Sequence, residues 1–133
     1  MTKSLSLIIA FISLLSTDEY YVKNYYSNGE MKEQGWMQDN EKIKYWFYYY
    51  ENGNKKEEGH YVKNNKSNWW ILYDRKEIVQ KKMEYKNNEL HGFTLIYENG
   101  DVVKAEKLSK KQKVQEWISV ANFKKDNPDF FKW

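Results

Sequence analysis

The chain has no cysteine, one proline and one arginine among its 133 residues. Without cysteine the protein has no disulfide, no thiolate nucleophile and no zinc–cysteine site. Its net charge of +3 comes from lysine with the sole exception of Arg75. This excess is too small to indicate a nucleic-acid groove, so nucleic acid is not an expected partner. The length allows one domain and excludes a multidomain enzyme.

Aromatic residues, by contrast, are abundant. Phe, Trp and Tyr make up 18% of the chain, although the mean hydropathy is only −0.98. Disordered segments are poor in aromatic residues, so the composition indicates a folded protein. Aromatic side chains also favour β-structure, and without disulfides the fold must be held by packing alone.

The first residues have the composition of an export signal. Lys3 is followed by an apolar run from Leu5 to Leu15, which ends before Asp18. The run is too short to span a membrane but suits the hydrophobic part of a secretory signal. Residues 1–17 are therefore predicted to be a signal peptide of an exported, periplasmic or cell-surface protein. The alternative is the first core element of a cytoplasmic protein.

A repeat organises the rest of the chain. Tyr-x-Asn-Gly occurs three times, ending at Gly29, Gly53 and Gly100, and these spacings of 24 and 47 residues leave room for one degraded copy. That copy is assigned to Tyr73-Asp74-Arg75-Lys76. Two series of aromatic residues then mark four units: Tyr26, Tyr50, Tyr73 and Tyr97, and, from the second unit on, Trp46, Trp69 and Phe93.

Each unit is predicted to be a β-hairpin. Asn-Gly between two aromatic-rich runs is a strong hairpin signal, because both turn residues adopt positive φ easily. A lone hairpin is marginal in water, whereas several in series stabilise one another. Residues 18–108 are therefore expected to form a mainly β domain, an antiparallel meander of about four stacked hairpins.

Alternation along the strands predicts two different faces. One face is expected to carry the repeat residues Trp46, Tyr50, Trp69, Tyr73, Phe93 and Tyr97. The other is expected to carry Phe47, Tyr49, Trp70, Leu72, Thr94 and Ile96. Exposed rings on a single-layer sheet would mark a binding surface, so Phe47, Tyr49, Trp70, Leu72 and Ile96 are candidate binding residues. The alternative is that these side chains are core.

Residues 109–133 are predicted to cap the sheet. Ser109 and Gln112 form a capping-box pattern, and helical spacing continues until Asn127-Pro128. Phe130, Phe131 and Trp133 could cover the open end of the sheet. The lysines between Lys104 and Lys125 would give such a helix a basic face, which suits either solvent or an anionic membrane surface.

The repeat resembles the bacterial variant of MORN repeats over about residues 20–108. The resemblance rests on a fixed order of features. An aromatic residue lies four positions before the tyrosine of Tyr-x-Asn-Gly, and a charged return strand and Gly-x-Tyr follow. The chain departs from this order in the third unit, where Asp74-Arg75-Lys76 replaces Asn-Gly, and in the first, where Val22 precedes Tyr26. Similar bacterial proteins are often described as antitoxins of toxin–antitoxin systems, and eukaryotic relatives as membrane or protein scaffolds. The resemblance thus implies a binding function.

Catalytic patterns are scarce. His60 and His91 occupy non-equivalent repeat positions, and Glu51 and Glu98 are expected on separate hairpin tips. No Gly-rich phosphate loop or nucleophile–base set is recognisable. The sequence therefore predicts a non-enzymatic binding or scaffold module with no cofactor or metal. A protein partner, such as a toxin, is the first hypothesis, and a glycan or a membrane surface is the alternative.

Overall fold

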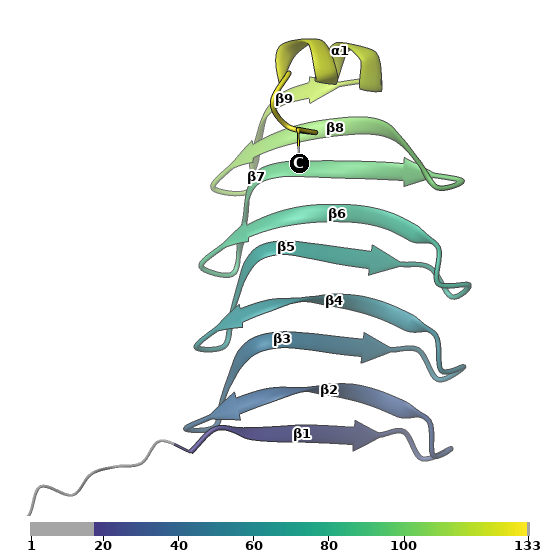
Figure 1. Cartoon of the computed structure of the whole chain (residues 1–133), viewed down its shortest axis with the longest axis vertical. Helices are drawn as coiled ribbons and strands as arrows, with labels where there is room; N and C mark the ends of the chain where they lie inside the picture. Colours follow the sequence, from purple (N-terminus) through teal and green to yellow (C-terminus); the bar gives the residue numbers. More distant parts are fainter. Residues whose placement is uncertain (1–17, 133) are drawn as a thin grey trace, which may run out of the picture.

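The computed structural model describes residues 18–132 as one antiparallel sheet followed by a short helix (Figure 1). The nine strands pair in sequence order. They are β1 (Tyr20–Tyr25), β2 (Met31–Gln38), β3 (Glu41–Tyr49), β4 (Lys55–Val62), β5 (Asn65–Tyr73), β6 (Val79–Lys86), β7 (Glu89–Glu98), β8 (Asp101–Ser109) and β9 (Gln112–Trp117). The predicted mainly β meander is confirmed. The predicted signal peptide lies outside the described residues.

The two edges of the sheet carry different turns. At one edge, two consecutive residues with positive φ join the strands at Asp39-Asn40, Lys63-Asn64, Asn87-Asn88 and Lys110-Lys111. At the other edge, five residues separate the paired residues Tyr25 and Met31, and the loops after β3 and β5 are equally long. The Gly29 N–H donates to the Tyr26 carbonyl oxygen at 3.0 Å, and the Tyr26 N–H donates to the Glu30 carbonyl oxygen at 2.8 Å. This is a type I turn closed by a bulge.

The predicted conformation of the Asn-Gly turns is therefore wrong in the first two units. In these units only Gly29 and Gly53 have positive φ, and Glu77, with φ 63°, takes the same place in the third unit. Only Asn99-Gly100, between β7 and β8, has positive φ at both residues. This fourth loop is one residue shorter than the others, so the repeat is 24 residues long until that point.

The repeat register consequently differs from the predicted one. Trp46 pairs with Gly59, which pairs with Trp70, so Trp70 and not Trp69 is the equivalent of Trp46. Likewise Tyr25, Tyr49, Tyr73 and Tyr97 occupy one pairing position, opposite Met31, Lys55, Val79 and Val102. Tyr26 and Tyr50 form a second series in the loops, where their hydroxyls donate to the carbonyl oxygens of Tyr49 and Tyr73. The single predicted row of tyrosines is thus two rows.

A register error of one residue exchanges the two faces of a strand. Trp46 and Tyr48 lie on the same face as Trp70 and Leu72, which we call the tryptophan face. The opposite face carries Phe47, Ile71 and Leu95 and packs against the helix, and we call it the cap face. The predicted faces therefore mixed residues from both sides, because the series Trp46, Trp69 and Phe93 is not structurally equivalent.

The C-terminal segment also differs from its prediction. Residues 112–117 form β9 and pair with β8, because Lys110-Lys111 makes a tight turn where a helix was expected to begin. The helix α1 spans only Val120–Asp126, and the Ser119 hydroxyl accepts from the Asn122 N–H. Ser119, and not Ser109, is the N-cap residue. Most lysines of the predicted basic helix therefore lie on strands or turns.

Helix α1 lies at the β9 end of the sheet, and the chain after it turns back beside β8 (Figure 1). Phe123 is fully buried against Leu95, Ala105 and Trp117. Phe130, in the tail, makes ring contacts with Trp69, Phe93 and Phe123. The described residues include no helix that is long and apolar enough to cross a membrane.

Candidate functional site

The tryptophan face holds two fully buried indoles on an otherwise single-layer sheet. Trp46 is 1% exposed and Trp70 is 0% exposed. Each indole lies over a glycine of the preceding strand, Gly35 or Gly59, at a place where any Cβ would overlap the ring. The indole N–H of Trp46 donates to the carbonyl oxygens of Trp36 and Ile43 at 3.0 and 3.1 Å, and that of Trp70 donates to the His60 carbonyl oxygen at 3.1 Å.

Lysines and tyrosines cover these indoles from the solvent side. The Lys42 ammonium lies 4.1 Å from the centroid of the Trp46 ring, and the Lys66 ammonium lies 3.9 Å from that of Trp70. Lys42 also forms an ion pair with Glu33 at 3.0 Å, and Lys66 forms the equivalent pair with Glu57 at 3.2 Å. Each cation thus has both a carboxylate and a ring as partners, which leaves this part of the face internally satisfied.

The pKa shifts in this network favour neutral tyrosines and a charged Glu33. Burial, together with the hydrogen bond between the Tyr48 and Tyr61 hydroxyls, raises the pKa of Tyr48. Burial raises the pKa of Tyr61 and Tyr85 as well. For Glu33 burial acts upward, but hydrogen bonds from Lys42 and Asn24 lower its pKa below the ordinary value. Such settings stabilise the fold and offer no free acid or base.

The network ends between β6 and β7. Thr94 stands at the position equivalent to Trp46 and Trp70, and Met83 stands at the position of the glycines. The larger side chain has thus moved to the other strand, and the buried Thr94 hydroxyl has no hydrogen-bond partner. The tryptophan face is consequently built around two glycine–tryptophan pairs, Gly35–Trp46 and Gly59–Trp70.

The cap face is divided between a covered part and an open part. Its central row runs through Lys23, Gln34, Phe47, Glu58, Ile71, Lys82, Leu95, Ala105 and Trp117. Helix α1 and the tail cover the end that contains Leu95, Ala105 and Trp117. The part on β1 to β3 has no such cover among the described residues, so its side chains face solvent.

The open part of the cap face is rich in aromatic rings. We define the aromatic patch as Tyr21, Trp36, Tyr45, Phe47 and Tyr49. Three of its members are exposed: Tyr21 at 40%, Trp36 at 36% and Tyr45 at 37%. Tyr21 and Trp36 meet edge to face at 5.3 Å, and Tyr45 and Phe47 lie 5.1 Å apart.

An apolar pocket separates the patch from the cap. We call it the cap pocket; its volume is about 290 Å³. Its lining residues come from β5, β6, β7 and the tail, and they are Trp69, Ile71, Lys82, Leu95, Tyr97, Phe130 and Phe131. Ligand sites are typically concave and mainly apolar with a few polar groups, which describes this pocket. Together the patch and the pocket form the candidate site.

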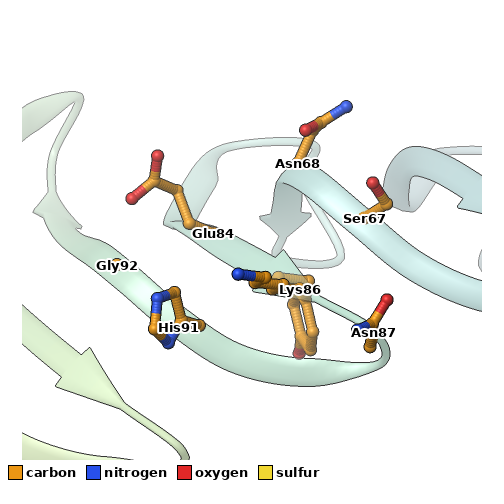
Figure 2. Close-up of a pocket in the computed structure, with 8 residues that line it drawn as sticks. Ser67, Asn68, Glu84, Lys86, Asn87, His91 and Gly92 are labelled. Atoms are coloured by element: carbon orange, nitrogen blue, oxygen red, sulfur yellow. The ribbon is translucent and has the colours of Figure 1, made fainter.

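A second, polar hollow lies where β5, β6 and β7 approach the tight turns (Figure 2). Ser67, Asn68, Glu84, Lys86, Asn87, His91 and Gly92 line it. The Glu84 carboxylate accepts the Phe93 N–H and lies against Gly92, so it already closes the bulge in β7. His91 and Lys86 are exposed side chains here. Tyr85 also lines the hollow, and burial raises the pKa of its phenol, so this group favours its neutral form.

The described residues include no cluster of three or more His, Cys, Asp or Glu side chains that could hold a metal ion. His60 lies beside the Tyr45 ring at 6.2 Å on the cap face, whereas His91 belongs to the polar hollow. The two histidines therefore do not form one site. The chemistry that the candidate site can offer is apolar contact, ring stacking and a small number of charged groups.

The structure separates the candidate binding residues into two groups. Phe47 and Tyr49 belong to the aromatic patch, whereas Trp70, Leu72 and Ile96 lie on the tryptophan face. Of this second group Trp70 is fully buried. The predictions missed Tyr21, Trp36 and Tyr45. A strict 24-residue alignment on Gly35-Gly59 and Trp46-Trp70 would have placed Tyr45 and Trp69 on the face opposite Trp46, but it would not have shown which rings are exposed.

Comparison of the chain with protein-family models and with curated proteins finds no match. The resemblance to MORN repeats therefore stays a prediction. The candidate site has to be interpreted from its own geometry.

Proposed function

We propose that this protein is a non-enzymatic binding module that holds a protein partner against the aromatic patch. The observation that carries the proposal is the uneven cover of the cap face. Trp117 and Phe123 at its β9 end are buried, whereas Tyr21, Trp36 and Tyr45 remain exposed. Monomeric proteins rarely leave a contiguous group of large apolar side chains in water, and such patches mark interaction surfaces.

The composition of the patch suits a protein partner. Tyr and Trp are enriched among the residues that contribute most to protein interfaces, because they bury a large area at a small cost in side-chain entropy. The strands hold the rings in place before binding, which reduces the ordering cost of association. Because the repeat pattern resembles MORN repeats, we further propose a toxin as the partner, with this protein as its antitoxin or immunity protein.

Two adjacent tyrosines on β1 provide a matched test. Tyr21 belongs to the patch and is 40% exposed, whereas Tyr20 points to the opposite face and is 45% exposed. We expect Tyr21→Ser combined with Tyr45→Ser to abolish capture of the partner in affinity purification from the native cell. Tyr20→Ser should leave capture unchanged.

Equal capture by all variants would contradict the proposal. A titration with soluble glycans, followed by intrinsic tryptophan fluorescence, tests the alternative ligand. A saturable change that Tyr21→Ser removes would replace the protein partner by a glycan.

A further inference from the structure

The third repeat unit contains a lysine where the two preceding units contain a satisfied hydrogen-bonding residue. Gln34, Glu58 and Lys82 are equivalent positions, 24 residues apart, in the central row of the cap face. The Gln34 amide donates to the Tyr49 hydroxyl at 2.6 Å, and the Tyr73 hydroxyl donates to the Glu58 carboxylate at 2.6 Å. Both side chains therefore serve to fix a tyrosine of the next unit.

Lys82 breaks this pattern. Its ammonium lies 5.6 Å from the centroid of the Tyr97 ring, and it has no carboxylate partner among the described residues. The other half-buried lysines of the sheet, which are Lys42, Lys55, Lys66 and Lys104, each pair with a glutamate. A half-buried cation without a counter-charge is less stable than a paired one. An anion that binds beside Lys82 would therefore stabilise its charged form.

This cation lies in the wall of the cap pocket. The other six residues that line the pocket are apolar or aromatic: Trp69, Ile71, Leu95, Tyr97, Phe130 and Phe131. None of the lining residues is acidic, and Lys82 is the one charged member. A volume of about 290 Å³ is sufficient for one large side chain and insufficient for a folded element. The pocket also borders the open part of the cap face, since Ile71 pairs with Glu58 and Glu58 with Phe47.

From this geometry we infer that the cap pocket receives one large apolar side chain of the protein partner, and that an acidic residue next to it in the partner pairs with Lys82. The inference rests on the proposed function and names the chemistry of the partner's anchor residue. Burial of the apolar side chain supplies most of the affinity. The ion pair selects acidic flanking residues, since neutral ones would leave the ammonium without a counter-charge.

Two synthetic peptides test the inference on the full chain: acetyl-Glu-Trp-Glu-amide and its neutral counterpart acetyl-Gln-Trp-Gln-amide. Binding is followed by NMR through the methyl signals of Ile71 and Leu95, which line the pocket. We expect both signals to move on titration. The acidic peptide should bind about three- to fivefold more tightly, as a partly exposed ion pair provides.

Neighbouring lysines on β6 give the control. Lys82→Met should remove the preference, so that this variant binds the acidic and the neutral peptide with equal affinity. Lys81→Met alters the exposed residue next to it, which faces the other side of the sheet, and should preserve the preference. Thermal unfolding of both variants confirms that the fold is retained.

Equal affinities for the two peptides, or methyl shifts of Ile71 and Leu95 that stay at zero, would overturn the inference. Shifts that follow protein concentration alone would also overturn it, because the occupant would then be a second copy of the chain. The proposed function is decided separately by the Tyr21 and Tyr45 variants. If the Tyr21 and Tyr45 variants no longer capture the partner, but neither peptide binds the unmodified protein, only the anchor residue has been misidentified.

Discussion

The two faces of this sheet are built from the same strands and rich in the same residue types, yet they use their rings in opposite ways. On the tryptophan face, Trp46 and Trp70 are buried under lysines and tyrosines that are themselves paired. On the cap face, Trp36 and Tyr45 remain 36% and 37% exposed. The tryptophan face thus buries its rings within the single layer, whereas part of the cap face leaves its rings in contact with solvent.

The two faces differ in the residue that lies opposite each ring. The tryptophan face has a glycine opposite each indole, so the ring can lie flat on the neighbouring strand and other side chains can cover it. The corresponding residues of the central row of the cap face are Gln34 and Glu58, whose side chains leave no such recess. The cap face must therefore be covered by another element, which α1 supplies at only one end.

Replacement of one ring on each face breaks the comparison most strongly. Trp70→Ala should lower the free energy of unfolding by about 4 kcal/mol, because it removes a fully buried indole. Tyr45→Ala should lower it by less than about 1 kcal/mol, because that ring is partly in water. Urea unfolding of the two variants measures both values. Similar losses would show that the faces do not differ in role.

The glycine beneath the indole provides the next test. Gly59→Ala places a methyl group where the Trp70 ring lies, and the ring cannot move without uncovering itself. We expect a loss of about 2 to 3 kcal/mol, as overpacking of a core produces. Ser67→Ala, on the adjacent strand, serves as the control and should change the free energy of unfolding by less than about 0.5 kcal/mol. A neutral Gly59→Ala would contradict the packing described for this face.

Alkaline pH should destabilise the folded protein through its partly buried tyrosines, of which the tryptophan face holds three. The pKa values of Tyr48, Tyr61 and Tyr85 are raised above the ordinary 10.0, chiefly by burial. Their contribution is therefore complete below pH 10 and decreases as the pH rises further, because only the unfolded chain ionises there. Ultraviolet absorbance titration, with circular dichroism in parallel, should find these phenols ionising together with unfolding. Ionisation of all tyrosines near pH 10 in a folded protein would refute this.

The smallest effect concerns the loop between β5 and β6. Glu77 has φ 63° at the position that Gly29 and Gly53 occupy in the first two units. Glu77→Gly should raise the free energy of unfolding by about 0.5 kcal/mol through relief of the left-handed conformation. Part of the gain is offset because the Glu77 carboxylate accepts the Lys55 N–H at 3.1 Å. Thermal unfolding measures the change, and a loss above about 1 kcal/mol would show that this hydrogen bond dominates.

Much of the fold could be predicted from local signals. Aromatic-rich runs separated by turn residues at a regular spacing were sufficient for the antiparallel meander of hairpins. The assignment of faces failed because two neighbouring aromatic residues, Trp69 and Trp70, both fit an approximate period. The correct choice depends on Gly59, whose missing side chain makes room for Trp70.

The candidate site was only partly predictable for the same reason. Phe47 and Tyr49 were identified as candidate binding residues and do lie in the aromatic patch, but their binding role stays a prediction. Tyr21, Trp36 and Tyr45 were missed, because exposure of a ring depends on what packs above it. The cap pocket unites β5 to β7 with Phe130 and Phe131, which are distant in the sequence.

By itself the sequence determined the repeating strands, the positions of the turns between β1 and β8 and the absence of cysteine chemistry, because these follow from residue type and from contacts between near neighbours. Tertiary structure alone decided which rings are buried, where the helix begins and how far the cap extends. These features depend on pairing register and on contacts between distant segments, and a shift of one residue along a strand reverses the side on which every ring lies.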